Sequence, residues 1–326
     1  MSAPRVGVWG VGTWGEKHAR VYAALAGTTF AGVYDRNAGR AREVAAQYGV
    51  EAFGSPEALL EACDAISIAV PTVGHREAAE RTAAAGRHAL VEKPMAVTVE
   101  EADAMIAAAR RAGVTLQVGQ VERFNPAFLA ARPHVRRPMF IEAHRLAVFQ
   151  PRSLDVDVVF DLMIHDLDLV LHAVGSAPES LSAVGVAVLS GNEDIANARL
   201  EFPDGCVANL TASRVSQERL RRIRFFQGDA YLSVDLFEKT GEMLRLDLSK
   251  LRPEAPLEAI RRGSLTVAPG EPLALELEAF VRSVRDGGPG AATAEEGRAA
   301  LAIAAEVRSA MKRRAAQWAG RSSVAS

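Results

Sequence analysis

The sequence predicts an α/β protein in two parts: a parallel, doubly wound sheet first, then an α+β part with a large, mostly antiparallel sheet. Two observations carry this prediction. Up to about residue 121, short apolar strands alternate with helices, which is typical of parallel sheets. After that point, short strand-like segments separated by tight turns dominate, which is typical of antiparallel pairing. We therefore divide the chain into residues 1–121 and 122–326.

The first part alternates strongly between the two kinds of element. The predicted strands span 5–10, 30–35, 65–70, 88–94 and 115–120, and the predicted helices span 16–26, 41–49, 75–86 and 98–113. Gly49 is a typical helix C-terminal residue. Thr98 followed by Glu101 forms a capping box, which marks the start of the last of these helices.

The second part is mostly strands. They are predicted at 139–150, 181–190, 194–202, 206–213, 221–228, 230–237 and 243–249, with turns such as "PDG" and "GD" between neighbours. A helix at 160–174 precedes most of them, and helices at 271–286 and 293–314 close the chain.

Composition excludes several functional classes. The chain has 326 residues, 49% of them hydrophobic and 24% charged, and its net charge of −2 gives no bulk attraction to nucleic acid or acidic membranes. The N-terminus has no signal-peptide pattern, and no uncharged apolar run is long enough for a membrane span. Cys63 and Cys206 lie outside any zinc or disulfide spacing. We expect a cytoplasmic protein without a metal site.

A glycine-rich turn lies between the first strand and the first helix. "GVGTWG" places Gly10, Gly12 and Gly15 as G-x-G-x-x-G, the pattern that lets a pyrophosphate approach a helix N-terminus. Asp35 ends the second strand, where a carboxylate accepts hydrogen bonds from ribose hydroxyls and favours NAD over NADP. Arg36 beside it weakens that preference, so NADP stays open. The alternative is a similar fold that binds no cofactor.

The stretch "DLMIHDLDLVLH" combines charge with a strongly apolar background. On a regular helix, Asp161, His165, Asp168 and His172 fall in one narrow stripe, and apart from Asp166 the other residues are apolar or small. Because burial of unpaired polar groups is costly, the stripe should face a cleft or a satisfied structural network. We interpret His172 as structural and Asp168 as a partner of His165 or of a lysine.

That lysine is Lys93 in "VEKP", which ends the fourth strand with Glu92 and Pro94. The carboxyl ends of such strands line the cofactor cleft, where an ammonium group can stabilise developing alkoxide charge.

Four motifs in this order resemble the glucose–fructose oxidoreductase, inositol dehydrogenase and MocA (Gfo/Idh/MocA) family: "GVGTWG", "AVPTVGH", "VEKP" and "DLMIHDLD". The resemblance implies a Rossmann domain and hydride transfer between a nicotinamide and a sugar or cyclitol hydroxyl carbon. It assigns catalysis to Lys93, Asp161 and His165, with His165 as the base. The predicted cofactor contacts are Gly10, Gly12, Thr13, Trp14, Gly15, Asp35, Arg36, Pro71, Thr72, His75, Glu92 and Lys93.

The segments 118–128 and 140–168 resemble a bacterial subgroup of that family, the UDP-N-acetylglucosamine 3-dehydrogenases, whose product leads to a 3-amino sugar for lipid A. The predicted substrate contacts are Lys93, Gln120, Arg123, Asn125, Arg145, Arg152, Asp161 and His165. Arginine suits the diphosphate of such a substrate. The run "RLRRIRFF" at 219–226 is interpreted instead as a solvated strand face or a subunit contact.

Two other functions stay open. One is an NAD(P)-dependent dehydrogenase of a free sugar or inositol, and the other is a non-catalytic regulatory protein that senses a dinucleotide. The set of Lys93, Asp161 and His165 argues against the regulator. The family resemblance also implies a homo-oligomer, either a dimer or a tetramer.

Overall fold

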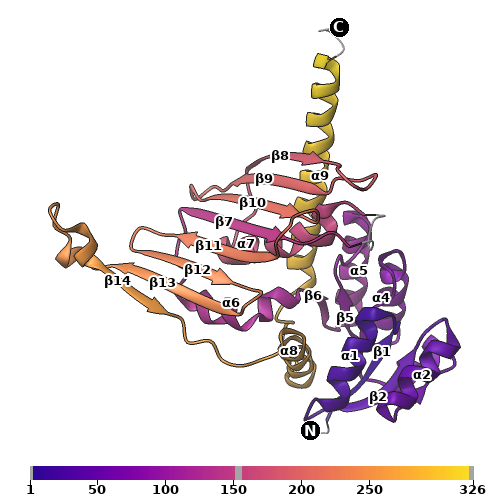
Figure 1. Cartoon of the computed structure of the whole chain (residues 1–326). Coiled ribbons are helices and arrows are strands. Elements are labelled where there is room, and N and C mark those ends of the chain that lie inside the picture. The colour runs from indigo at the N-terminus through magenta and orange to yellow at the C-terminus, as the bar shows by residue number, and fades with distance from the viewer. Residues whose placement is uncertain (1–2, 151–155, 323–326) are drawn as a thin grey trace. The chain divides into compact units, whose positions relative to one another are not determined.

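The computed structural model describes residues 3–150 and 156–322 of the chain (Figure 1). Contacts divide the chain into two compact units. Unit 1 joins the chain up to Phe124 with Gly270–Leu301, and unit 2 joins Asn125–Pro269 with the chain from Ala302 onward. The expected functional boundary at residues 121 and 122 stays a prediction. The segment 270–301, which that boundary places in the second part, packs with the first.

Unit 1 contains a six-stranded parallel sheet in the order β3-β2-β1-β4-β5-β6, which confirms the doubly wound Rossmann architecture. Its strands are β1 (Arg5–Trp9), β2 (Thr29–Tyr34), β3 (Glu51–Ala52), β4 (Ala65–Ile68), β5 (His88–Glu92) and β6 (Leu116–Gly119). Its helices are α1 (Thr13–Ala24), α2 (Ala38–Tyr48), α3 (Pro56–Ala62), α4 (His75–Ala84), α5 (Val99–Ala112) and α8 (Pro272–Asp286), with 3₁₀ turns η1 (Thr72–Gly74) and η2 (Val121–Phe124).

Local signals fix the helix ends in unit 1. The predicted capping box is confirmed: the Thr98 hydroxyl accepts a hydrogen bond from the Glu101 backbone N–H, and the Glu101 carboxylate accepts one from the Val97 N–H. Gly49 ends α2 in the left-handed conformation, as predicted. Helix α3, which we did not predict, begins with the Ser55 cap and a proline at its first position.

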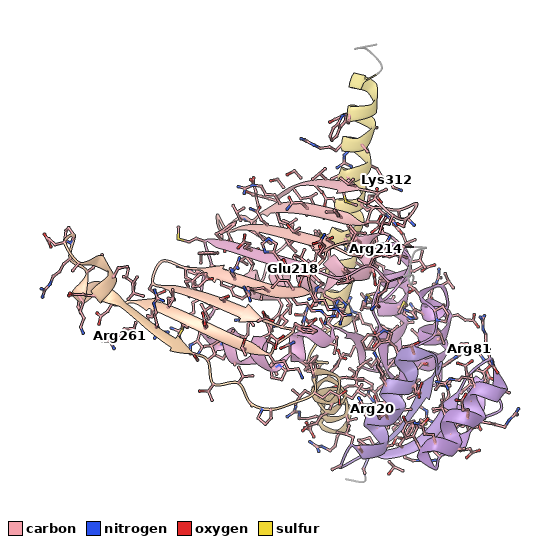
Figure 2. All side chains as sticks on the ribbon, viewed as in Figure 1. Arg20, Arg81, Arg214, Glu218, Arg261 and Lys312 are labelled. Atoms are coloured by element: carbon pink, nitrogen blue, oxygen red, sulfur yellow. The ribbon has the colours of Figure 1, made fainter. Side chains whose placement is uncertain are left out.

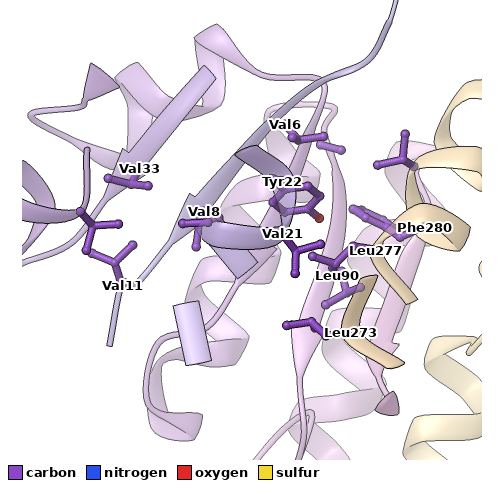
Figure 3. Close-up of a cluster of buried hydrophobic side chains, with 14 of the residues drawn as sticks. Val6, Val8, Val11, Val21, Tyr22, Val33, Leu90, Leu273, Leu277 and Phe280 are labelled. Atoms are coloured by element: carbon purple, nitrogen blue, oxygen red, sulfur yellow. The ribbon is translucent and has the colours of Figure 1, made fainter. Parts of the chain in front are cut away.

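The core of unit 1 joins segments from both ends of the chain. Apolar residues of β1, α1 and β5 pack against α8, whose Leu273, Leu277 and Phe280 are at most 4% exposed (Figure 3). At about 25 cal/mol per Å² of buried apolar surface, each such side chain contributes on the order of 1.5–3 kcal/mol. Helix α8 is therefore an integral part of this unit.

Unit 2 is built on an eight-stranded sheet in the order β14-β13-β12-β11-β7-β10-β9-β8 (Figure 1). The strands are β7 (Phe140–Leu146), β8 (Ser180–Val186), β9 (Ile195–Glu201), β10 (Val207–Ser213), β11 (Leu220–Phe226), β12 (Ala230–Asp235), β13 (Thr240–Leu246) and β14 (Ile260–Ser264). All neighbours pair antiparallel except β7 and β10, which pair in parallel. The predicted mostly antiparallel sheet is confirmed.

Helices cover one face of this sheet. They are α6 (Pro126–Ala131), a π-turn (Val159–Met163), α7 (Ile164–Val174) and part of α9 (Ala294–Ser322), with short 3₁₀ turns at Arg132–His134, Leu248–Lys250 and Pro256–Ala259. The π-turn packs on β10, α7 packs on β7 and β10, and α6 packs on β12 and β13. Along β7, Ile141, Ala143 and Arg145 point to the covered face, and the alternate residues are half-buried.

Two short strands, β3 and β14, were also absent from the prediction. β3 has only two residues, and four of the five residues of β14 are exposed, so neither shows an alternating pattern. Within the described residues, no helix is long and apolar enough to cross a membrane.

Candidate active site

The strand order of unit 1 locates its ligand crevice. The connections reverse direction between β1 and β4, and in open α/β sheets ligands bind beyond the carboxyl ends of the strands at this point. The glycine-rich turn follows β1, and the Lys93 segment follows β5, so both lie at the carboxyl edge of the sheet.

The glycine turn is shaped for a pyrophosphate. Gly10 has φ of +90°, which favours glycine, and a Cβ on Gly15 would lie 1.7 Å from the Gly10 carbonyl oxygen. A Cβ on Gly12 would instead meet open space. Helix α1 begins there without a side-chain cap, so its first N–H groups are available to an anion. These residues fit the pyrophosphate of NAD.

Asp35 is held at the same turn. One carboxylate oxygen accepts a hydrogen bond of 2.8 Å from the Val11 N–H, and the other accepts one of 2.8 Å from the Asn37 N–H. The side chain is half-buried, while Arg36 beside it is exposed. This carboxylate has lone pairs left for ribose hydroxyls, which fits the predicted role in NAD binding.

The other predicted cofactor residues lie on nearby turns. Thr13 and Trp14 are exposed in the first turn of α1, and the Lys17 ammonium lies 4.2 Å from the Trp14 ring centroid. Pro71 is exposed and Thr72 is half-buried, both just after β4.

His75 is buried and bridges two loops. Its Nδ1 lies 3.0 Å from the Pro94 carbonyl oxygen, and its Nε2 lies 2.9 Å from the Val70 carbonyl oxygen. Burial lowers the pKa of His75 below its usual value, although hydrogen bonding to the carbonyls opposes this effect. Both ring nitrogens face backbone carbonyls, so the structure gives His75 a positioning role between the β4 loop and the Lys93 segment. The predicted cofactor contact of His75 stays a prediction.

Glu92 points into the protein. Its Oε1 lies 2.9 Å from Nε2 of His18, which is fully buried, and its Oε2 accepts a hydrogen bond of 3.2 Å from the Lys93 N–H. Gly119 leaves the space that this carboxylate occupies. His18, which the sequence analysis missed, thus anchors the residue before Lys93. A histidine in α1 carries no sequence signal that would pair it with β5.

Lys93 itself is half-buried directly after β5. In the sheet, Glu92 pairs with Gly119, so Lys93 and Gln120 follow neighbouring strand ends. Gln120 is 2% exposed, and its Oε1 has no hydrogen-bond partner among the described residues. A buried amide oxygen of this kind needs a partner, which agrees with the predicted ligand contact of Gln120.

Two other predicted substrate residues form an ion pair or hydrogen bonds within the protein. Arg123 is buried and lies 2.8 Å from the Glu296 carboxylate. Asn125 caps α6 by accepting from the Ala127 N–H, and its amide donates to the Leu236 carbonyl. Their predicted substrate contacts stay predictions, but these groups already have strong partners inside one unit. Arg152 lies outside the described residues.

In unit 2, the predicted helix at 160–174 begins as a π-turn. Asp157 starts it by accepting hydrogen bonds from the Val159 and Phe160 N–H groups. Asp161 lies in the π-turn and His165 in the first turn of α7, and both are half-buried. The π-turn breaks the regular angular spacing on which the predicted stripe was based.

Further along, the polar residues of α7 are unequally exposed. Asp168 is 1% exposed and His172 is half-buried with its ring 6.3 Å from that of Phe128. Asp166, which the stripe left out, forms a bidentate pair with Arg145: the Nε–Oδ2 distance is 2.9 Å and the Nη2–Oδ1 distance is 2.7 Å. Arg145 is therefore held by Asp166 inside unit 2, and its predicted contact with a diphosphate stays a prediction.

Asp161 lines a pocket of about 240 Å³ within unit 2. Arg214 forms part of its wall and donates to Asp194, to the Val156 carbonyl and to Ser190. Burial opposes ionisation of Asp194, but hydrogen bonds from Ser190 and Arg214 outweigh it and hold the pKa well below its usual value. Arg214 and the neighbouring Glu218 lie at one end of the sheet (Figure 2).

Comparisons with known proteins agree with this geometry. Residues 4–120 match the NAD-binding Rossmann fold of the Gfo/Idh/MocA oxidoreductase family, and residues 106–230 match the C-terminal domain of the same family. UDP-N-acetylglucosamine 3-dehydrogenase of Acidithiobacillus ferrooxidans is 42% identical over 94% of this chain and 97% of its own. Its solved structure superposes with a TM-score of 0.89, covering 96% of this chain and 99% of that one.

More distant relatives include scyllo-inositol 2-dehydrogenase (NAD(+)) of Bacillus subtilis, 29% identical over 65% of this chain and 68% of its own. The structure of levoglucosan dehydrogenase with NADH and levoglucosan has a TM-score of 0.84 at 18% identity, over 95% of this chain and 97% of that one, which shows a shared fold. The chain belongs to the Gfo/Idh/MocA family and is an NAD-binding oxidoreductase that acts on CH–OH groups.

Proposed function

We propose that the protein oxidises the 3-hydroxyl of UDP-N-acetylglucosamine with NAD. The observation that carries this proposal is the 42% identity, along nearly the whole chain, to the dehydrogenase of A. ferrooxidans that is named for this reaction. The glycine turn with Asp35 supports NAD over NADP, because a 2′-phosphate beside that carboxylate would be repelled. The exposed Arg36 limits this preference.

Lys93, Asp161 and His165 are the proposed catalytic residues. Bound NAD supplies the hydride acceptor. His165 takes the hydroxyl proton, since an imidazole titrates near neutral pH. Lys93 stabilises the alkoxide that develops on the same oxygen, and Asp161 binds an adjacent hydroxyl or orients the imidazole. The buried His18–Glu92 pair and the His75 bridge fix the backbone on both sides of Lys93.

The cellular setting is part of the proposal. A 3-oxo sugar nucleotide is the substrate that an aminotransferase needs to make a 3-amino sugar, and such a route leads to lipid A. We infer a cytoplasmic enzyme that acts as a dimer or tetramer, and light scattering on the purified protein measures the subunit number.

The direct test is NADH absorbance with purified protein, NAD and UDP-N-acetylglucosamine. A glutamate-dependent aminotransferase is added to remove the ketone, because oxidation to the ketone is uphill. NADH formation that requires the UDP-sugar supports the proposal. Turnover of inositol or a free hexose, with none of the UDP-sugar, refutes it in favour of a free-sugar dehydrogenase. Binding of NAD without turnover of any of these substrates favours the regulatory alternative.

A further inference from the structure

The arginines of the run at 219–226, in and just before β11, point to both faces of the sheet. Arg222 lies 2.9 Å from Asp235, and Arg224 lies 2.6 Å from Glu142. These two arginines alternate with Ile223, which is fully buried on the helix-covered face. They therefore point to the open face of the sheet. The interpretation of the run as a solvated strand face or a subunit contact stays a prediction.

Arg219 and Arg221 have the opposite parity and line the pocket that contains Asp161. Both are exposed. In the register of β11 and β7, Arg221 lies directly opposite Arg145. Arg145 is paired with Asp166 and does not line the pocket, whereas Arg219 and Arg221 do.

An aromatic side chain also lines this pocket. Phe237, in the turn between β12 and β13, lines it and is 47% exposed. The turn is held firmly, since Asp235 accepts hydrogen bonds from the Phe237 and Glu238 N–H groups as well as from Arg222. Leu146 and Val148 complete an apolar wall at the end of β7.

We propose that this pocket binds the nucleoside diphosphate part of the substrate, with Arg219 and Arg221 on the diphosphate and Phe237 stacked on the base. This inference rests on the proposed function, and it names the side chains that make the enzyme select a nucleotide-linked sugar.

The charges of the pocket agree with such a ligand. A diphosphate diester carries two negative charges, and two exposed guanidinium groups match them with charge-assisted hydrogen bonds. The third arginine of the wall, Arg214, is buried against Asp194, whereas Arg219 and Arg221 are exposed. Asp161 would repel a phosphate but accept hydrogen bonds from sugar hydroxyls. The ligand is thereby oriented with its sugar toward Asp161, its diphosphate on Arg219 and Arg221, and its base on Phe237.

Calorimetric titration of UDP into the full-length protein with NAD present tests the diphosphate contacts. The variants Arg219→Ala and Arg221→Ala should each weaken UDP binding roughly ten- to hundredfold. Arg261→Ala is the matched control, because this exposed arginine lies at the opposite end of the same sheet from Arg214 (Figure 2). It should leave binding within about twofold. Thermal unfolding of every variant confirms that the fold is retained.

Phe237→Ala separates base recognition from phosphate recognition. It should weaken UDP roughly five- to hundredfold, the range for loss of one stacked base, and leave inorganic pyrophosphate unchanged. Phe237→Tyr should restore UDP binding. Equal loss of UDP and pyrophosphate in Phe237→Ala, or no loss of either, would refute the stacking role.

The outcomes separate this inference from the proposed function. If UDP-N-acetylglucosamine is oxidised but KM is unchanged in the double variant Arg219→Ala/Arg221→Ala, the pocket inference is wrong and the function stands. If UDP binds and the arginine variants abolish binding, but UDP-N-acetylglucosamine is not oxidised, the pocket inference stands and the proposed substrate is wrong. Absence of UDP binding to the unmodified protein overturns the pocket inference.

Discussion

Replacing Arg145 by methionine is expected to destabilise unit 2 by about 3–5 kcal/mol, the usual cost of breaking a buried ion pair by removing one partner. The Arg145 and Asp166 side chains are only 3% and 5% exposed, and two hydrogen bonds join them. Methionine fills most of the arginine volume, so the loss comes from the unpaired Asp166 carboxylate and not from a cavity.

Urea unfolding monitored by far-UV circular dichroism measures this change. Because the chain has two compact units, the transition should be fitted for each unit where two steps are resolved. The double variant Arg145→Met/Asp166→Leu removes both charges and should recover most of the lost stability, since apolar replacements of whole buried pairs are often neutral.

The same variants decide between the two roles considered for Arg145. If the Arg145–Asp166 pair has only a structural role, the KM of the double variant for the UDP-sugar stays within about threefold of that of the unmodified protein, after correction for the folded fraction. An Arg145→Met variant with unchanged urea midpoint and a KM raised more than tenfold would refute our reasoning and restore the diphosphate contact predicted from the sequence.

Four further outcomes are expected. Gly12→Val should weaken NAD binding more than tenfold without lowering the melting temperature, because the added side chain enters open space needed by the pyrophosphate; fluorescence titration checks this. His165→Ala should lower kcat by about 10²–10⁴ with NAD affinity retained, and a large loss of NAD affinity would contradict a purely catalytic role. Burial lowers the pKa of His75 in the folded chain, so the unfolded chain takes up this proton at a higher pH than the folded chain does. The contribution of His75 to the free energy of unfolding is therefore complete above pH ~6.5 and is lost as the pH drops below it; a His75→Gln variant should show a urea midpoint that depends less on pH. Burial raises the pKa of Cys63 to about 12 and that of Cys206 to about 11, so neither should react with iodoacetamide before unfolding, as mass spectrometry can show.

The Rossmann sheet was predicted well from the sequence because the signals that define its strands and helices each lie within a few residues. Each strand of four or more residues in unit 1 is an apolar run between helices, and the glycine turn, the Thr98 cap and the Gly49 stop act within a few residues. The strands of unit 2 other than β14 were also recognisable, although their ends shifted by a few residues. The parallel pairing of β7 with β10 was not, because it depends on which strands meet after the intervening helix and hairpin.

The charged residues of the site were harder to assign. Arg145 and Arg221 look equivalent in the sequence, and both point to the helix-covered face of neighbouring strands. What separates them is the position of Asp166, which follows from the π-turn and the packing of α7. Likewise, Glu92, whose predicted cofactor contact stays a prediction, meets His18 of α1, a contact across 74 positions of sequence. Such partners are set by tertiary packing, which no local pattern encodes.

The contribution of α8 to unit 1 has a consequence for synthesis on the ribosome. When Phe124 has been made, the Rossmann sheet is complete in sequence, but Leu273, Leu277 and Phe280 of its core do not yet exist. The usual order, in which an N-terminal domain folds before the next one is made, is therefore interrupted here. Until α8 emerges, the nascent chain exposes an apolar surface over β1, α1 and β5 that a chaperone could recognise. A fragment that ends near residue 124 should expose the same apolar surface, which binding of a hydrophobic dye or aggregation of the fragment would reveal.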